Sequence, residues 1–218
     1  MADSVPVIAA VSGSCSPVSA GQIGWARDNG FHAERLDLKR ALDPDTRQGE
    51  VRRVVDLAGA AIRRGTSALI YSAEGPQDPS VIHFDQIAAC AGLERAQAAR
   101  CIGTTLAQAM RELLDQVDVQ RIVVAGGDSS GEVASALEIS ALSVLAGMAP
   151  GAPLCRAWSE NRRRDGLQVV LKGGQIGNRT FYGDVLAGKP IAAPPLTPLP
   201  LLPLLPPSPP LAHGAGMV

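Results

Sequence analysis

A glycine-rich turn recurs three times along this chain, each time directly after a short run of β-branched and aliphatic residues. The three turns occupy residues 11–16, 125–131 and 172–177. Glycine lets the backbone turn sharply and approach a ligand closely, because it has no Cβ. A turn of this kind that enters a helix also directs free N–H groups at an anion above it. Three such turns from distant parts of one chain predict a composite phosphate-binding site.

Length and charge restrict the partners that we expect. The 218 residues suffice for one domain with a buried core. The 20 basic and 21 acidic residues leave a net charge of −1, which disfavours nucleic acid and anionic membranes as partners. Aromatic residues make up only 3% of the chain, too few for extensive base stacking. No apolar run reaches the length of about 18 residues that a membrane span needs.

Cysteine usage and the first residues indicate the compartment. The four cysteines show no Cys-x-x-Cys spacing, which disfavours a structural zinc site and favours a reduced protein. The opening Met-Ala-Asp-Ser lacks the basic start and apolar stretch of a signal peptide. We therefore expect a cytoplasmic protein.

Composition divides the chain into a domain, residues 1–189, and a tail, residues 190–218. The tail holds ten of the 17 prolines and no Asp, Glu, Lys or Arg. Proline removes backbone donors and interrupts helices and sheets, so the tail is expected to be extended or disordered. It is either a docking peptide for a proline-binding groove or an extension without a role in the domain.

Hydrophobic periodicity in residues 1–189 alternates between strands and helices. Strands are predicted at 5–11, 32–38, 67–71, 121–125, 143–145, 154–158 and 167–171; helices are predicted from Pro17 to about Asn29 and at 47–64, 93–117, 132–137 and 181–186. Residues 72–80 read as a loop. This order predicts an α/β fold, a three-layer sandwich with a mostly parallel, Rossmann-like sheet. Ligands of such sheets bind at the carboxyl ends of the strands, where all three turns are expected.

The middle turn has the clearest chemical logic. Its candidate binding residues are Gly126, Gly127, Asp128, Ser129, Ser130 and Gly131. The glycines allow close approach to an anion, and the serines offer hydroxyls and helix-start amides. Asp128 would repel a phosphate unless it holds Mg²⁺, orients a hydroxyl or caps the helix, and it is the candidate catalytic residue. The alternative is a structural strand–helix turn with a polar cap.

The outer two turns add further candidates: Ser12, Gly13, Ser14, Lys172, Gly173 and Gly174. Three hydroxyls in residues 12–16 exceed what one helix cap requires, and the lysine could supply a point charge to phosphate oxygens. Neither turn forms a Walker A loop or a Rossmann fingerprint. Cys15 has no neighbouring histidine in the sequence, which disfavours a catalytic thiol.

Four ordered segments resemble the four-carbon acid sugar kinases, and specifically their C-terminal nucleotide-binding domain. They are Ser-Gly-Ser-Cys-Ser-Pro-Val at 12–18, Val-Val-Ala-Gly-Gly-Asp-Ser-Ser-Gly at 123–131, Ala-Pro-Gly-Ala-Pro-Leu-Cys at 149–155 and Leu-Lys-Gly-Gly-Gln-Ile-Gly at 171–177. The resemblance runs from about residue 5 to residue 186. It implies that Ser14 and Gly126 to Ser129 contact ATP or ADP, with Gly173 and Gly174 at the phosphate end. Ser129 stands where the family usually has threonine, which keeps the hydroxyl.

The resemblance implies an ATP-dependent kinase for acid sugars such as threonate or erythronate, with Mg²⁺ accompanying the nucleotide. Family kinases are about twice this length, and their N-terminal half carries most of the acid-sugar site. We therefore expect the sugar to be held by such a domain or by a partner chain, with little or no turnover by this chain alone.

Other functions stay open on the sequence alone. One is a non-catalytic nucleotide-binding or adaptor module whose tail docks elsewhere; some relatives carry a type III effector label, although no residues here support secretion. Another is a phosphate-binding hydrolase, for which the pattern offers no nucleophile. The sequence also leaves open whether the chain forms a homodimer.

Overall fold

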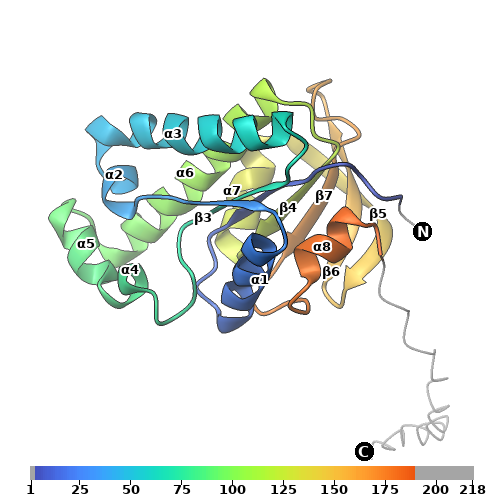
Figure 1. Ribbon diagram of the computed structural model, residues 1–218. Helices are drawn as coiled ribbons and strands as arrows, with labels where there is room; N and C mark the ends of the chain where they lie inside the picture. The colour runs from blue at the N-terminus through green and yellow to red at the C-terminus, as the bar shows by residue number, and fades with distance from the viewer. Residues whose placement is uncertain (1–2, 190–218) are drawn as a thin grey trace, which may run out of the picture.

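Seven strands form one sheet in the order β2-β3-β1-β4-β7-β6-β5 in the computed structural model, which describes residues 3–189 (Figure 1). The strands are β1 (Ala9–Ser12), β2 (His32–Arg35), β3 (Ala68–Tyr71), β4 (Arg121–Ala125), β5 (Ile139–Ala149), β6 (Ala152–Ser159) and β7 (Gln168–Lys172). The helices are α1 (Pro17–Asp28), α2 (Leu38–Leu42), α3 (Pro44–Arg63), α4 (Pro79–Ile82), α5 (Phe84–Cys90), α6 (Arg95–Gln116), α7 (Gly127–Ala136) and α8 (Phe181–Leu186). The predicted tail lies outside the described residues.

The sheet is parallel over most of its width. Strands β2, β3, β1, β4 and β7 run parallel to their neighbours. Strand β6 pairs antiparallel with both β7 and β5, so a hairpin completes the sheet on one side. This arrangement confirms the predicted mostly parallel sheet.

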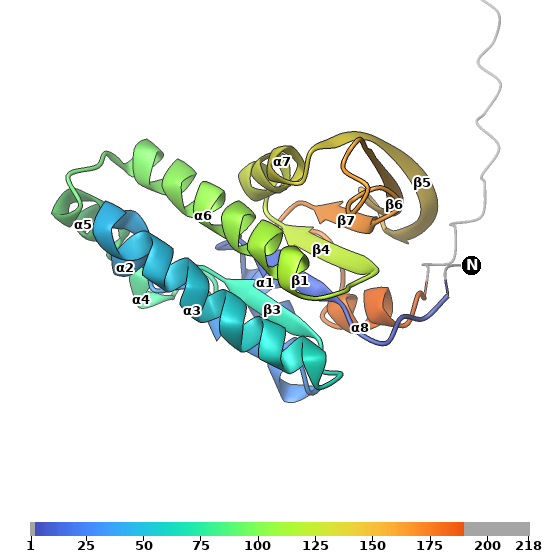
Figure 2. The same ribbon diagram turned by 90° about the horizontal axis from the view of Figure 1, so that it is seen from above.

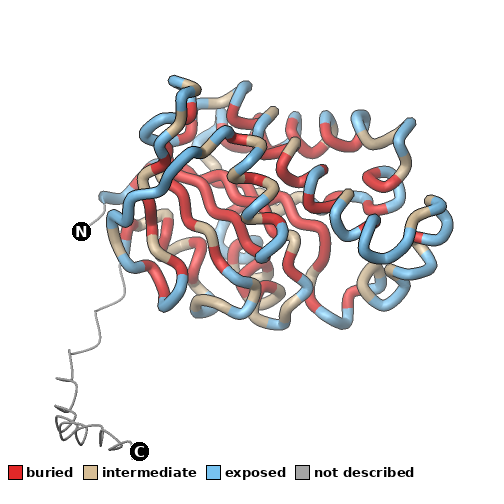
Figure 3. The backbone as a smooth tube through the Cα atoms, turned by 180° about the vertical axis from the view of Figure 1, so that it is seen from behind, coloured by how far each residue is buried: buried red, intermediate tan, exposed pale blue. Residues whose placement is uncertain are grey.

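Helices cover both faces of the sheet and bury two apolar cores (Figure 2). Ala9 and Val11 of β1 face the core beneath α3 and α6, whereas Ala10 between them faces the core beneath α1 and α8. This alternation follows from the two-residue period of a strand. Figure 3 shows the buried strands as the red centre of the molecule. The three-layer sandwich is thereby confirmed.

Capping residues explain where several helices begin and end. Pro17 occupies the first position of α1, where the missing N–H costs nothing, and the Ser16 side chain accepts from the Ser19 amide. Gly30 follows the C-cap Asn29 of the same helix with φ +86°, a conformation that favours glycine. Gly65, with φ +79°, ends the turn after α3 in the same way.

Several predicted elements differ from the structure. The predicted strand 32–38 stops at Arg35, because the Asp37 carboxylate accepts from the amides of Lys39 and Arg40 and starts α2. The predicted loop 72–80 ends in α4, which the Asp78 side chain caps. The short strand predicted at 143–145 is the middle of the eleven-residue β5, which pairs along β6.

Helix α7 begins earlier than predicted. Its first residue is Gly127, so the polar stretch expected to be a turn before residue 132 already forms the first turns of the helix. None of the described helices combines the length and the apolar composition that a membrane crossing needs.

Candidate functional site

The three glycine turns meet at the carboxyl ends of neighbouring strands in the sheet. They follow β1, β4 and β7, which are consecutive neighbours in the strand order. The Gly13 amide donates to the Ala125 carbonyl at 2.9 Å, and the Gly126 amide donates to the Lys172 carbonyl at 2.9 Å. The hydrogen bonds between neighbouring strands therefore continue into the turns and fix the positions of the turns relative to one another.

Helix α1 also ties the first turn to the third. The hydroxyls of Ser16 and Ser19 both donate to the Gly174 carbonyl, at 2.6 Å and 3.0 Å. One turn further along α1, the Gln22 side-chain amide donates to the carbonyls of Ile176 and Asn178, at 3.0 Å and 2.9 Å. Ser16 and Ser19 were not among the predicted site residues, although the hydroxyl-rich start of α1 is visible in the sequence.

Two of the glycines leave no room for a side chain. A Cβ at Gly13 would lie 2.1 Å from the Ser129 hydroxyl, and a Cβ at Gly174 would lie 2.1 Å from the Ser14 hydroxyl. Glycine at these positions therefore permits close approach between turns. At Gly127, in contrast, a Cβ would meet no atom within 4 Å, so this glycine borders open space.

The N-terminus of α7 is open to an anion. Its N-cap is Gly126, with φ +122°, and no side chain caps it. Helices α1 to α4 are each capped by a serine or aspartate side chain. The first amides of a helix lack intrahelical partners and lie at the positive end of its dipole. Gly127 and Asp128 are exposed at this end of α7.

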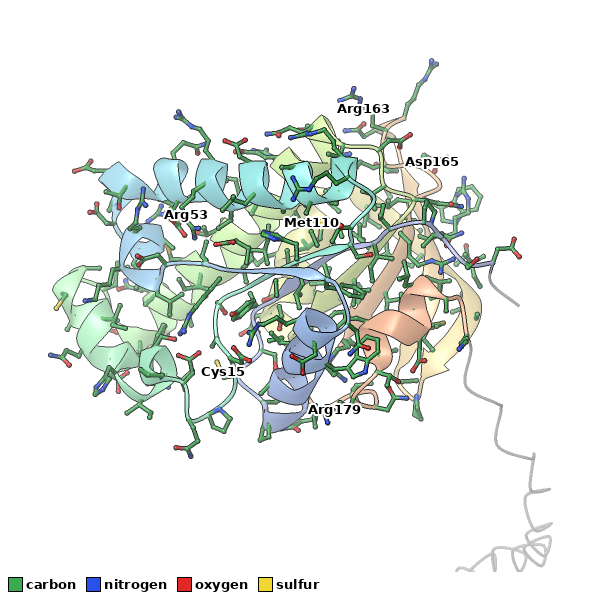
Figure 4. All side chains as sticks on the ribbon, in the orientation of Figure 1. Cys15, Arg53, Met110, Arg163, Asp165 and Arg179 are labelled. Carbon is green, nitrogen blue, oxygen red and sulfur yellow. The ribbon has the colours of Figure 1, made fainter. Side chains whose placement is uncertain are left out.

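A recess of about 190 Å³ adjoins this helix start. Gly13, Cys15, Asp128 and Ser129 line one part of it, and α6 supplies Arg95. Figure 4 shows Cys15 in the segment that leads from β1 to α1. Cys15 is exposed, but burial of its sulfur and the carboxylate of Asp78 raise the pKa of the thiol above its usual range. A protonated thiol is a weak nucleophile, because the thiolate is the reactive form.

Lys172 lies elsewhere than expected. Its ammonium group was expected to face phosphate, whereas the residue is only 2% exposed and its side chain lies on the α8 side of the sheet. Its Nζ donates to the Gly173 carbonyl at 3.2 Å and lies 5.6 Å from the centre of the Phe181 ring. Burial lowers the pKa of Lys172 to about 8. In this position the lysine contacts the turn from behind.

The Ser12 side chain also points away from the carboxyl ends of the strands, where the turns meet. Its hydroxyl is fully buried, and neither it nor the buried phenol of Tyr182 has a hydrogen-bond partner among the described residues. Burial raises the pKa of Tyr182. The expected contact of Ser12 with a ligand therefore has no support from its side-chain position.

The remaining candidates divide by exposure. Ser14 and Ser129 are buried, Gly13, Ser130 and Gly174 are half-buried, and Gly127, Asp128, Gly131 and Gly173 are exposed. Ser130 uses its hydroxyl within α7, donating to the Gly126 carbonyl at 2.7 Å. Across residues 3–189 there is no cluster of three or more His, Cys, Asp or Glu side chains that could hold a metal ion by itself.

Comparison with known proteins assigns the family. The family described as "Nucleotide-binding C-terminal domain" matches residues 9–182. A 3-oxo-isoapionate kinase from Paraburkholderia graminis is 64% identical over 188 residues, which are 86% of this chain and 40% of that kinase. A 3-oxo-tetronate kinase from Cupriavidus necator is 31% identical over 192 residues, which are 85% of this chain and 40% of that kinase.

A solved structure supports the same fold. The crystal structure of a Haemophilus influenzae protein of the family DUF1537 superposes with a TM-score of 0.67 at 21% identity, covering 84% of this chain and 40% of that protein. The chain thus spans about 40% of the length of the relatives it matches. It belongs to the nucleotide-binding C-terminal domain family, the C-terminal part of the acid sugar kinases that its motifs resemble.

Proposed function

We propose that this chain binds ATP or ADP through the three glycine turns and is the nucleotide-binding part of a kinase that phosphorylates acid sugars. The observation that carries the proposal is the uncapped N-terminus of α7, which begins at Gly127 between the turns after β1 and β7. A helix start with a preceding glycine is suited to phosphate, because its amides and its dipole both favour negative charge.

The nucleotide contacts follow from the exposed surfaces of the turns. The amides of Gly127 and Asp128 at the start of α7 bind phosphate oxygens, and Gly173 and Gly174 border the phosphates from the third turn. Ser14 serves mainly to shape the first turn, because its Oγ accepts from the Ser16 amide at 3.2 Å and packs against Gly174. Lys172 supports Gly173 from the buried side.

Magnesium would accompany the nucleotide. Mg²⁺ in kinases is commonly held by one or two carboxylates together with phosphate oxygens and water. Asp128 is the only carboxylate among the described residues that line the recess. It is therefore the residue that we propose to hold Mg²⁺, which when bound neutralises charge on the transferred phosphoryl group.

The relatives suggest the acceptor class. Two of the similar proteins are named as kinases of 3-oxo-isoapionate and 3-oxo-tetronate. We infer that the phosphate acceptor is an oxo acid sugar of this kind, held by the part of the relatives that this chain does not span or by a partner chain. We also infer a cytoplasmic location, since all four cysteines are free.

Calorimetric titration with ATP and ADP tests nucleotide binding. We expect saturable binding by the chain and its loss in Gly127→Val, because the new side chain enters the space at the helix start, where a Cβ meets no protein atom within 4 Å. Gly24→Val is the matched control, since Gly24 lies within α1 and also has no atom within 4 Å of a Cβ. Folded protein that binds neither nucleotide would contradict the proposal.

A second substitution separates the metal from the nucleotide. In Asp128→Asn we expect ADP to bind as in the unmodified chain without Mg²⁺, while the gain in affinity that Mg²⁺ provides is lost. An equal loss with and without Mg²⁺ would instead assign Asp128 to the fold or to the nucleotide itself. Kinase activity is measured separately, by adding an oxo acid sugar, and we expect little or none from this chain alone.

A further inference from the structure

Strand β5 forms an open edge of the sheet. It is the last strand in the order and pairs only with β6 among the described residues. At eleven residues it is also the longest strand. Figure 2 shows β5 curving along the outside of the molecule, with no described element beyond it. Alternate backbone N–H and C=O groups of such an edge strand are available to another strand.

The same hairpin carries most of the exposed apolar surface. Of the six large hydrophobic side chains that are exposed in the described part of the chain, four lie on β5 and β6: Leu142, Val144, Leu145 and Trp158. Val144 is the most exposed of them, at 70%. The two helical members of the six, Leu57 and Ile82, lie on α3 and α4. The apolar surface is therefore concentrated along the open edge.

This edge lacks the charges that usually protect one. No Asp, Glu, Lys or Arg occurs from residue 139 to residue 155, and β5 contains no proline. Natural proteins commonly place lysine, proline or a bulge on exposed edge strands to prevent pairing with another chain. Three register shifts interrupt β5, but the pairs from Ala141 to Val144 with β6 are regular. These four residues form a short, regularly paired and uncharged edge.

We propose that β5 pairs antiparallel with β5 of a second copy of this chain, joining two sheets across a two-fold axis. The pairing is centred on residues 141–144, the regular part of the edge. Leu142 and Val144 lie on the same sheet face, because they pair with Ala157 and Cys155, which alternate with Arg156 along β6. A symmetric antiparallel pair therefore brings these apolar side chains of the two copies together.

The absence of charged residues on β5 favours the β5 strand of a second copy as its partner. An uncharged strand meets neither repulsion nor an unpaired charge when it pairs with itself. The other open edge of the described sheet, β2, is a poor match, because it has four residues and its Glu34 and Arg35 form ion pairs with Arg53 and Asp78 of the same molecule. An isologous β5 contact also closes on itself and produces a dimer without further growth.

Sedimentation and hydrogen exchange over a wide concentration range test the proposal with the complete 218-residue chain. We expect a monomer–dimer equilibrium in which the outward-facing amides of residues 141–144, those that are not bonded to β6, become protected from exchange as the dimer forms. Val144→Lys should raise the dimer dissociation constant by at least about tenfold, because each lysine would replace an apolar side chain opposite Leu142 of the other copy and would place two like charges on one face of the joined sheet. Leu57→Lys is the control, as it adds the same charge at an exposed leucine on α3.

The outcomes separate the occupants. A chain that stays monomeric, or a dimer whose β5 amides exchange freely, overturns the proposal. If the outward-facing amides of residues 141–144 are protected from hydrogen exchange at every protein concentration, the proposal is also overturned, because a segment of the same molecule would then cover the edge. Circular dichroism of Val144→Lys checks that the fold is retained, and Leu145→Glu provides a second substitution on the same edge with opposite charge.

Discussion

The hydroxyl of Ser16 donates a hydrogen bond to the carbonyl oxygen of Gly174 at 2.6 Å, although 158 residues separate the two in the sequence. Ser16 is also the N-cap of α1, where its Oγ accepts from the Ser19 amide at 3.0 Å. One side chain thus starts a helix and fixes the third glycine turn against the first.

We predict that Ser16→Ala lowers the free energy of unfolding by about 2 kcal/mol, the sum expected for loss of an N-cap and of a partly buried hydrogen bond. Urea unfolding measures the change. Thr104→Ala is the control, since the Thr104 hydroxyl is exposed and donates only to the Arg100 carbonyl of its own helix. A loss no larger than that of the control would show that the Ser16 bridge contributes little.

Gln22 supports the same turn from the next part of α1. Its buried side-chain amide donates to two carbonyls, those of Ile176 and Asn178. Gln22→Leu removes both donors at similar volume and leaves the carbonyls unpaired, so we predict a loss of about 1–3 kcal/mol in unfolding free energy. Hydrogen exchange should also become faster in residues 173–178.

Gln108→Leu is the control for this substitution. The Gln108 side-chain amide also donates two hydrogen bonds, to Gln48 and Glu112, but on the exposed surface of α6 and α3. We expect its loss to change stability by less than about 0.5 kcal/mol. Equal effects of the two substitutions would mean that the third turn does not depend on Gln22.

Much of the architecture could be predicted from local pattern. Strand β4 and helix α8 have the predicted bounds, because a continuous apolar run and a short apolar helix with a clear start leave little choice. The boundaries that differed depend on side chains that act locally. The Asp37 carboxylate ended β2 and started α2, which an alternating apolar pattern does not reveal.

The site was predictable in position but not in side-chain direction. Placement of the turns at the carboxyl ends of β1, β4 and β7 followed from the parallel sheet. The face that each residue takes depends on strand register, which the sequence alone did not determine. Lys172 pairs with Ala125 at the end of β4, and its side chain lies on the α8 side of the sheet instead of facing the site at the carboxyl ends of the strands.

Close packing between the first two turns makes a further prediction. A Cβ at Gly13 would lie 2.1 Å from Ser129 Oγ but 3.4 Å from Ser129 Cβ, so the conflict is with the hydroxyl. We predict that Gly13→Ala destabilises the fold by about 1–3 kcal/mol, as expected for overpacking. In the background of Ser129→Ala the same change should cost less than half as much.

A double-mutant cycle on thermal or urea unfolding measures this coupling. If Ser129→Ala reduces the cost of Gly13→Ala, the Ser129 hydroxyl is the group that requires glycine at position 13. Additive effects would instead point to the backbone or to Leu106, whose Cδ1 would lie 3.3 Å from the same Cβ.

The buried ammonium of Lys172 makes stability depend on pH. Its pKa falls from the ordinary 10.5 to about 8 in the folded chain because of burial. Between these values the unfolded chain binds more protons than the folded chain, so this residue makes the unfolding free energy rise with pH. Below pH 8 both states are protonated, and the cost of burying the charge, on the order of 3 kcal/mol, is present in full.

Lys172→Met removes the titrating group but keeps an apolar chain against Phe181. The cost of burying the charge disappears, and the loss of the bond to the Gly173 carbonyl changes little with pH. We therefore predict that the stability of the variant relative to the unmodified chain is highest near pH 7 and falls by about 2 kcal/mol by pH 9.5.

Comparing the two proteins cancels the titration of Tyr182 and the cysteines, which both contain. Urea unfolding at several pH values measures the difference, and Lys39→Met controls for loss of an exposed lysine. A difference that stays constant from pH 7 to 9.5 would mean that Lys172 keeps its proton in the folded chain over this range and would contradict the prediction.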